Sequence, residues 1–306
     1  MASVTLAQSA KLSQDTLVVG VIENVVTVNR MFELLPFEGI EGNALAYNRE
    51  LALGDVQVGG VDTAITAKTA ATFTQVASSL TTIVGDAEIN GLLQATRSNL
   101  GNDQTAVQIA SKAKACGRSF QNMMINGTGG ANQFNGLINL CGVSQEVTTT
   151  GNGQALSFAL LDELIDAVSD KDGEVDYIAM PQRTIRSLNA LLRALGGAAI
   201  NDVLELPSGR TVPQYRGIPV LRNDWIPINQ TQAAGTALTT VFAGTFDDGS
   251  QTHGLAGLTA KNEAGIVVEE VGLAEAADNR IWRVKWYCGL ALFNELGLAM
   301  LTGITN

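Results

Sequence analysis

The sequence predicts an α+β protein with more than one structural unit and one long helix. Three patterns indicate this class: a helical repeat of apolar residues over 105–125, helices alternating with strands over 151–255, and two long strand patterns at 266–271 and 280–293. At 306 residues the chain is longer than most single domains. It can therefore bury a substantial core without disulfides or metals.

The composition indicates a protein that covers part of its surface with other proteins. Only 16% of residues are charged, against roughly 25% in an ordinary soluble protein, while 46% are hydrophobic. The longest apolar runs, in 289–293 and 297–301, are far shorter than the ~20 residues that a bilayer span requires. The first residues lack the basic and apolar regions of a secretion signal, so we expect folding in the cytoplasm and no membrane association. The net charge of -11 opposes a phosphate backbone, and sequence-specific DNA binding is not expected.

The first 88 residues read as two segments that lack a core of their own. Residues 1–41 carry one amphipathic stretch, 17–28, and then a short apolar run that Pro36 prevents from continuing as a helix. Residues 42–88 are rich in Thr, Ala, Val and Gly, which is typical of a β ribbon with small side chains. An isolated two-stranded ribbon is marginally stable in water, so this one should lie on another surface.

The clearest helix is predicted over 105–125, with Asn102 as its N-cap. At ~1.5 Å per residue it would be about 31 Å long. Its apolar residues recur at steps of three and four: Ala106, Ile109, Ala110, Ala113, Cys116, Phe120, Met123 and Met124.

Residues 151–255 read as an α/β unit. We predict helices over 158–168 and 182–195, strands over 177–180 and 239–243, and a hairpin within 211–227. Each helix has one apolar stripe that would cover a face of a sheet.

The last strand pattern places Trp282, Val284 and Trp286 on one side and Arg283 and Lys285 on the other. Across the ribbon, Glu269 and Glu270 can face these cations. Being adjacent in a strand, the two glutamates should point to opposite faces, which excludes joint acid/base work.

The sequence offers little for catalysis. His253 is the only histidine and lies in a polar loop, which favours a surface residue over a catalytic one. Cys116, Cys141 and Cys288 form no C-x-x-C pair, so we expect buried free thiols, with interchain bridging as the alternative.

The glycine-rich segment 127–136 ends a helix, whereas a phosphate site begins one, so it reads as a cap and turn. Acidic clusters such as Asp247 and Asp248 read as solvated surface, with a weak calcium site as the alternative. We expect no cofactor, no metal and no enzymatic activity.

Three local phrases carry a family resemblance: Phe134-Asn-Gly-Leu137 after the long helix, Tyr177-Ile-Ala-Met-Pro181, and Tyr215-Arg-Gly-Ile-Pro-Val220. With the order of elements, they make the chain resemble the major capsid proteins of tailed bacteriophages, which have the Hong Kong 97-like fold. The resemblance covers nearly the whole chain. It implies an N-terminal arm at 1–41, an extended β loop (E-loop) at 42–88, the spine helix and first part of the P domain at 89–135, the A domain at 136–255, the long P-domain strands at 256–295, and a C-terminal strand returning to the A domain at 296–306.

The resemblance implies a structural function. The chain would assemble with itself into hexamers and pentamers, forming an icosahedral shell that encloses a double-stranded DNA viral genome in the virion, after assembly in the host cytoplasm. The implied partners are a portal, a cement protein in some members, and a separate scaffolding protein, because the sequence shows no long charged helical N-terminal segment. The alternative is that this chain begins after cleavage of such a segment, and Met1 favours a separate scaffolding protein. Candidate inter-subunit contacts are Arg49, Glu50, Lys68, Glu269, Glu270, Arg280, Arg283 and Lys285.

Some members of this family also join an E-loop lysine to a P-domain asparagine of a neighbour. Here Lys68 is the only lysine within 42–88, and Asn262, Asn279 and Asn294 are the asparagines available. Such a bond requires a positioned carboxylate with a raised pKa, and no sequence pattern identifies one. We therefore expect a shell without these bonds.

Three alternatives remain at this stage. An encapsulin-like bacterial compartment shell shares the fold, and another assembly protein, such as a tail subunit, would share the composition. A cytosolic α/β enzyme or small-molecule binder could be built on residues 151–255.

Overall fold

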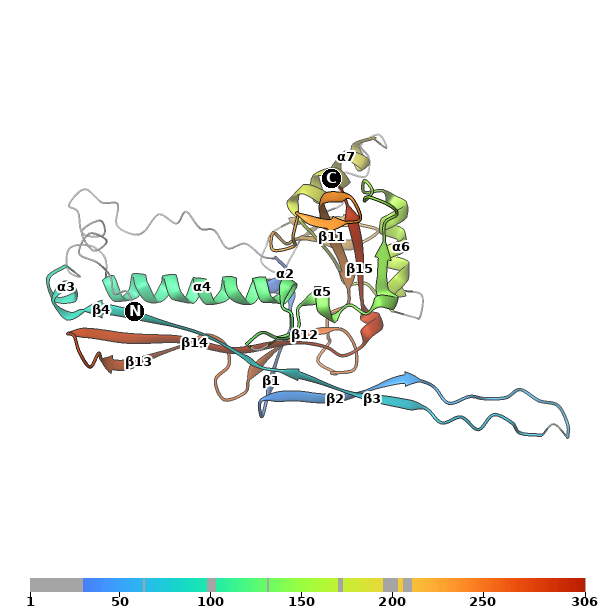
Figure 1. Cartoon of the computed structure of the whole chain (residues 1–306), viewed down its shortest axis with the longest axis horizontal. Helices are drawn as coiled ribbons and strands as arrows, with labels where there is room; N and C mark the ends of the chain where they lie inside the picture. Colours follow the sequence, from blue (N-terminus) through green and yellow to red (C-terminus); the bar gives the residue numbers. More distant parts are fainter. Residues whose placement is uncertain are drawn as a thin grey trace.

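The computed structural model describes residues 30–62, 64–97, 103–130, 132–169, 173–194, 203–205 and 211–305. The predicted amphipathic stretch 17–28 and the predicted cap Asn102 lie outside these ranges. Figure 1 shows a long helix lying along a narrow sheet, a second sheet with two helices standing at one end of that helix, and a thin ribbon projecting from the base.

The narrow sheet has five strands around β14, which spans Asn279–Leu292. Along one edge β14 pairs with β4 (Thr81–Asn90), and along the other it pairs in succession with β12 (Leu255–Ala260) and β13 (Val267–Leu273). The strand β1 (Phe37–Ile40) adds to β12 in parallel. The predicted strands at 266–271 and 280–293 are thus confirmed within two residues.

The long helix α4 spans Gln104–Asn126 and packs on β4 and β14, which confirms the prediction. Its N-cap is Asp103, whose side chain accepts a hydrogen bond from the Thr105 N–H at 2.9 Å, so the predicted cap was one residue too early. At the other end the Gly127 N–H donates to the Met123 carbonyl at 2.8 Å, as expected of a cap and turn.

The predicted apolar stripe of α4 is wrong at two alanines, whereas Ile109, Ala113 and Met123 are half-buried. Cys116, Phe120 and Met124 are buried, but Ala106 and Ala110 are exposed. The prediction was wrong at these alanines because, apart from Gln104, the buried residues of α4 all lie between Cys116 and Ile125.

An aromatic cluster joins α4 to the narrow sheet. The rings of Phe120 and Trp286 lie 4.7 Å apart between centroids, and Phe32, Phe37 and Phe134 complete the cluster. Phe32 belongs to the short helix α2 (Arg30–Leu34), which ends before Pro36 as predicted. This cluster is part of the largest hydrophobic core, which also receives side chains from the second sheet.

The second sheet has eight strands in the order β5-β15-β11-β6-β9-β8-β7, with β10 paired to β11. The strands are β5 (Glu146–Thr148), β6 (Tyr177–Met180), β7 (Val203–Glu205), β8 (Thr211–Tyr215), β9 (Ile218–Arg222), β10 (Gln230–Gln232), β11 (Gly235–Gly244) and β15 (Leu298–Ile304). The predicted strands at 177–180 and 239–243 and the predicted hairpin are therefore confirmed.

Two helices, α6 (Phe158–Ser169) and α7 (Gln182–Ala194), cover this sheet. Their apolar stripes belong to one core cluster, together with alternate residues of the strands such as Ile178, Val241 and Ala299. Both helices therefore cover the same face. The predicted end of the second helix, residue 195, lies outside the described residues.

The ribbon consists of β2 (Ala44–Ala52) and β3 (Thr72–Ser79), paired antiparallel, with the tip, residues 53–71, between them. After Leu80 the chain continues directly into β4, so the ribbon is an extension of the narrow sheet (Figure 1). The remaining elements are short: α3 (Gly91–Arg97), α5 (Leu137–Leu140), η2 (Val143–Gln145) and η3 (Glu295–Gly297). None of the helices within the described ranges has the length and apolar character needed to cross a membrane.

Candidate inter-subunit surfaces

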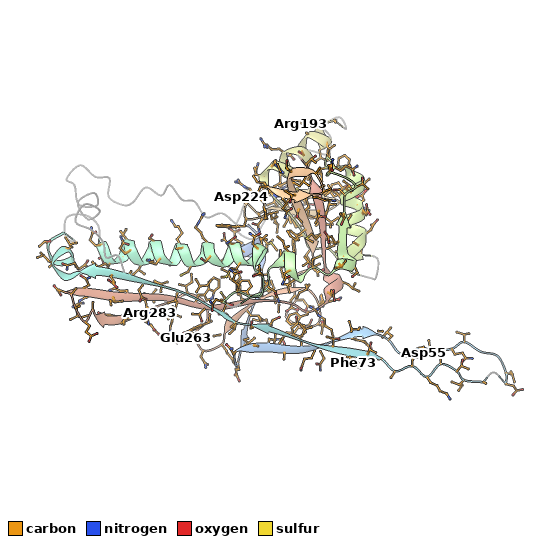
Figure 2. All side chains as sticks on the ribbon, viewed as in Figure 1. Asp55, Phe73, Arg193, Asp224, Glu263 and Arg283 are labelled. Carbon is orange, nitrogen blue, oxygen red and sulfur yellow. The ribbon has the colours of Figure 1, made fainter. Side chains whose placement is uncertain are left out.

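The ribbon carries a set of apolar side chains that the described chain leaves uncovered. Seven of them, in the tip and beside it, are 62% to 100% exposed: Leu51, Leu53, Val56, Val58, Val61, Ile65 and Phe73. Figure 2 shows the tip extending away from both sheets. So many exposed large apolar side chains on one segment indicate an interaction site.

Side-chain hydrogen bonds, with one backbone bond from the Asp55 N–H to the Thr69 carbonyl at 3.3 Å, hold the tip together. The Asp55 carboxylate accepts a hydrogen bond from the Thr69 N–H at 2.5 Å, and the Gln57 side-chain oxygen accepts one from the Thr66 N–H at 2.8 Å. Lys68 lies between these closures and is exposed. The tip is thus a loop shaped by local bonds, with its apolar residues outside.

The base of the ribbon is fixed to the same chain. The Tyr47 hydroxyl donates to the Leu292 carbonyl at 2.7 Å, and the Arg49 Nε donates to the Phe293 carbonyl at 3.0 Å. Arg49 also lies 3.7 Å from the Glu295 carboxylate and is only 17% exposed. The candidate contact Arg49 therefore has an intrachain role, whereas the neighbouring Glu50 is exposed.

A network of charges lies on the face of the narrow sheet away from α4. Arg283 donates two hydrogen bonds of 2.8 Å to the Asp86 carboxylate, and Lys285 lies 2.8 Å from Glu269 and 3.0 Å from Glu263. The hydrogen bonds that Arg283 donates to Asp86 hold the pKa of that carboxyl below its usual value, and those that Lys285 donates to Glu269 and Glu263 raise the pKa of Lys285. The predicted pairing of Glu269 with a cation across the strands is confirmed.

The second predicted acidic residue, Glu270, points to the opposite face, as expected for adjacent strand residues, so the expectation that it faces Arg283 and Lys285 is wrong. Its carboxylate lies 3.7 Å from the Arg280 guanidinium, and both side chains are exposed. Of the eight candidate contacts, the structure brings together Glu269 with Lys285 and Glu270 with Arg280, pairs Arg283 with Asp86, and places Arg49, Glu50 and Lys68 elsewhere.

Sequence reasoning missed three partners of the candidate residues: Asp86 binds Arg283, Glu263 binds Lys285, and the ring of Tyr47 lies 5.6 Å from the Arg49 guanidinium. Asp86 is directly opposite Arg283 in the β4–β14 register. The sequence signal that could have identified Asp86 was the strand pattern of 81–90. Its partner strand, β14, is almost two hundred residues away in the sequence. Without that pairing, Asp86 reads as an ordinary surface carboxylate.

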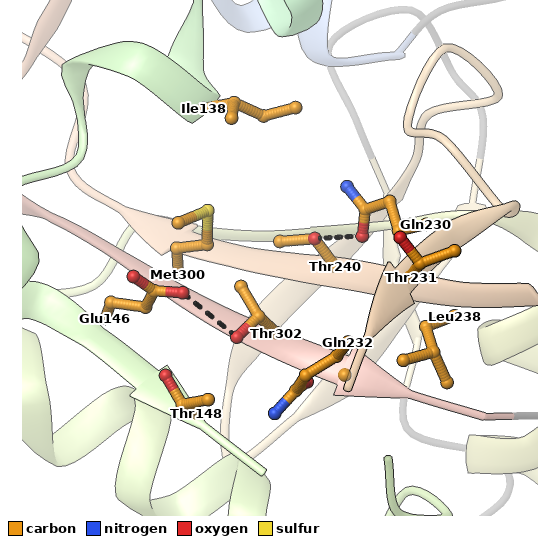
Figure 3. Close-up of a pocket in the computed structure, with 11 residues that line it drawn as sticks. Ile138, Glu146, Thr148, Gln230, Thr231, Gln232, Leu238, Thr240, Met300 and Thr302 are labelled. Atoms are coloured by element: carbon orange, nitrogen blue, oxygen red, sulfur yellow. Dashed lines mark hydrogen bonds between the residues drawn. The ribbon is translucent and has the colours of Figure 1, made fainter. Parts of the chain in front are cut away.

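The eight-stranded sheet has an open hollow of about 520 Å³ on one face (Figure 3). Its polar side chains already bond to one another: Thr302 donates to Glu146 at 3.1 Å, and Thr240 donates to Gln230 at 2.7 Å. Glu146 is the only ionisable residue in the lining. With one ionisable residue and with its polar side chains hydrogen-bonded to one another, the hollow is a surface depression and lacks the features of a catalytic pocket.

The residues considered for chemistry lie apart from this hollow. The Nδ1 atom of His253 is 3.0 Å from the Thr252 hydroxyl, and its Nε2 is 4.0 Å from Asp248. The side chain is 45% exposed, so the surface position predicted for it is confirmed. Within the described ranges, no three His, Cys, Asp or Glu residues are grouped so that they could hold a metal ion.

The three cysteines are free thiols, as predicted. Cys116 and Cys288 are buried, whereas Cys141 is half-buried. Burial raises the pKa of Cys141 and of Cys288 to about 12, which keeps these thiols protonated and unreactive at neutral pH.

Comparison with solved structures shows the fold over the full length of the chain. The holo-SrpI encapsulin complex from Synechococcus elongatus PCC 7942 matches with a TM-score of 0.75 at 19% identity, covering 99% of this chain and 96% of that one. The capsid asymmetric unit of Cyanophage A-1(L) matches with a TM-score of 0.67 at 15% identity, covering 99% and 100%. The Mycobacterium phage Ogopogo structure matches with a TM-score of 0.65 at 14% identity, covering 98% and 99%.

Sequence comparison identifies the family. No curated protein sequence matches the chain. The family model described as SU10 major capsid protein matches residues 47–240, more than half of the chain. This match includes β3, β4, α4, both helices of the second sheet and most of β2 and β11. The chain therefore belongs to the SU10 major capsid protein family and has the Hong Kong 97-like fold of a tailed-bacteriophage major capsid protein, the subunit that forms the capsid shell.

Proposed function

We propose that the chain assembles into hexamers and pentamers that close an icosahedral shell around a double-stranded DNA genome. The observation that carries this proposal is the ribbon tip, with apolar side chains that its own chain leaves in water. Burial of such surface contributes about 25 cal/mol per Å², partly offset by the cost of ordering and association. A shell repeats this contact in every subunit.

The parts of the chain take the roles that the family resemblance implies. The ribbon, within 42–88, is the E-loop and lies across a neighbouring subunit. The P domain with its spine helix, from 89–135 and 256–295, supplies α4 and the strands β12, β13 and β14 of the narrow sheet, to which β4 from 42–88 and β1 from 1–41 are added. The eight-stranded sheet is the A domain, from 136–255 with the strand of 296–306, and it meets its equivalents around the axis of each capsomer. Residues 1–41 form the arm.

The candidate contact residues fall into two groups under this proposal. Glu50, Lys68, Glu270 and Arg280 are exposed and can contact a neighbour, although Glu270 and Arg280 also pair with each other. Arg49, Glu269, Arg283 and Lys285 contact groups of their own chain first, so they shape the surfaces that a neighbour meets.

The proposed partners follow from the same role. They are further copies of the chain, a portal, a separate scaffolding protein and a cement protein. The DNA is enclosed without sequence-specific binding, which agrees with the net charge of -11. Assembly takes place in the host cytoplasm, the product is the capsid of the virion, and the role is structural and non-enzymatic.

A compartment shell is the second candidate, because the encapsulin complex shares the fold with a TM-score of 0.75. The contents of purified particles separate the two. A viral capsid made in infected cells should protect long double-stranded DNA from added nuclease, whereas a compartment should contain protein cargo and no protected genome.

The ribbon tip can be tested directly. Val56→Asp, Val58→Asp and Val61→Asp, combined in one chain, should abolish shell formation while leaving the thermal unfolding of the subunit unchanged, because these side chains pack on nothing within the subunit. The matched control replaces the same three valines by leucine, which keeps the surface apolar. Electron microscopy and sedimentation give the yield of particles. Wild-type yields of shells from the aspartate variant would contradict the proposal.

A further inference from the structure

The two helices that cover the eight-stranded sheet have opposite charge. Every charged residue of α6 is acidic, namely Asp162, Glu163 and Asp166. Every charged residue of α7 is basic, namely Arg183, Arg186 and Arg193. A helix with charge of one sign only on its outer surface repels a copy of itself and attracts its opposite.

One charge on each helix is already occupied within the subunit. The Asp162 carboxylate accepts hydrogen bonds from the Tyr215 hydroxyl at 2.8 Å and from Arg216 at 3.1 Å. The Arg183 guanidinium donates to the Ala237 carbonyl at 2.7 Å. These two residues therefore fix the helices to neighbouring loops and strands.

The other four charges are exposed and form no ion pair in the described part of the chain. On α6 they are Glu163 and Asp166, three residues apart, and we call this pair the acidic face. On α7 they are Arg186 and Arg193, two helical turns apart, and we call this pair the basic face. The Nε of Arg193 donates only to the Asn189 carbonyl of its own helix, at 3.2 Å.

The fold keeps the two faces from meeting within one subunit. The helix α6 packs across β15 and β11, whereas α7 packs on β9, which is separated from β11 by β6. In Figure 1, α6 runs along one flank of the sheet and α7 lies at the end away from α4, where Figure 2 labels Arg193. The acidic face and the basic face are therefore both available to another molecule. Because the two faces are complementary, a second copy of this chain offers the matching surface to each of them.

We propose that the acidic face of α6 in one subunit contacts the basic face of α7 in the next subunit around a capsomer ring. This contact rests on the proposed function, because it requires that the chain forms rings. The residues of the two faces would then hold neighbouring subunits together in each ring. Because the two faces differ, the contact is heterologous, and repetition by rotation closes a ring. Two like faces in register would repel, so the same charges also oppose a back-to-back dimer.

Charge reversal tests the contact. Glu163→Lys with Asp166→Lys makes both helices basic, and Arg186→Glu with Arg193→Glu makes both acidic. Each variant alone should lower the yield of rings and shells about tenfold or more, because every ring contact then joins like charges. The chain with all four reversals should recover assembly, since acidic and basic faces are only exchanged. Thermal unfolding of the unassembled subunits, expected to be the same for all variants, controls for folding.

A mixture of the two double variants gives a sharper result. Each copy can then contact only copies of the other kind, so subunits must alternate around a ring. Alternation is possible in a hexamer and impossible in a pentamer. The mixture should therefore form hexamers and open hexameric sheets or tubes, visible by electron microscopy, but no closed shells.

Three results would overturn the contact. They are normal shells from either double variant alone, no recovery in the fourfold variant, and closed shells with pentamers from the mixture. Failure of the fourfold variant would show that the helices face a different partner, such as scaffolding protein or DNA. Failure of the wild-type chain to assemble would contradict the proposed function and this contact together, whereas wild-type shells that tolerate the reversals contradict this contact alone.

Discussion

Single residues hold the narrow sheet to the long helix, and Phe120 is central among them. It is fully buried, and its ring lies within 5.7 Å of the ring centroids of Phe32, Phe37, Phe134 and Trp286. Phe120→Ala should lower the free energy of unfolding of the unassembled subunit by about 3–5 kcal/mol, measured with urea. Leu92→Ala, at a residue 66% exposed on α3, should change it by about 0.5 kcal/mol or less. Equal effects of the two variants would contradict the assignment of this core.

The pair of Asp86 and Arg283 predicts a pH dependence. Arg283 lowers the pKa of Asp86 in the folded subunit below its usual value of 3.8, so ionised Asp86 stabilises the fold above that pH. This contribution is lost as the pH falls through the lowered folded pKa. Asp86→Asn should therefore lower the Tm at pH 7 by about 1–3 °C, because the pair is partly exposed to solvent, and the difference should vanish in strong acid.

The control for this titration is Glu275→Gln, an exposed residue without an ion pair in the described chain. Its Tm should equal that of the wild type across the range. A difference between Asp86→Asn and the wild type that is unchanged from pH 7 to strong acid would show that the carboxylate charge has no part in stability.

Among the helices and strands, those with a strong local period could be predicted from the sequence. The boundaries of α4, α6, β6 and β14 agree with the predictions within one residue. Pairings between distant segments could not be predicted, because the pattern of a strand does not identify its partner. The continuation of β3 into β4, and the bonds from Arg49 to the end of β14, became visible only in the fold.

The ribbon itself predicts a change in dynamics on assembly. From sequence, the whole of 42–88 was expected to lack a core of its own, but β4 pairs along its full length with β14. We therefore expect fast amide exchange in the tip alone, where the described residues form no strand, and protection of the tip once shells form. Hydrogen exchange followed by mass spectrometry measures both states, with α4 as the protected reference. Strong and equal protection of the tip before and after assembly would exclude a role for it at an interface.

At the scale of the complete particle, the question is whether Lys68 of one subunit is joined covalently to an asparagine of a neighbour. Lys68 is exposed in the tip, and of the three asparagines, Asn279 accepts a hydrogen bond from Asn90 and Asn294 caps η3. We predict that mature particles boiled in detergent and reductant release one band near 32.1 kDa. A ladder of multimers that survives reductant and disappears in Lys68→Arg would show that subunits are joined through this lysine.

Three features indicate that the subunit is stabilised further by contacts with neighbouring copies. They are the composition of the chain, its uncovered ribbon tip and the complementary helices of the second sheet. Native mass measurement and electron microscopy of the purified wild-type chain, over a range of concentration and salt and with or without scaffolding protein, address this directly. We predict capsomers and closed shells built of many copies. A monodisperse monomer under all of these conditions would contradict it.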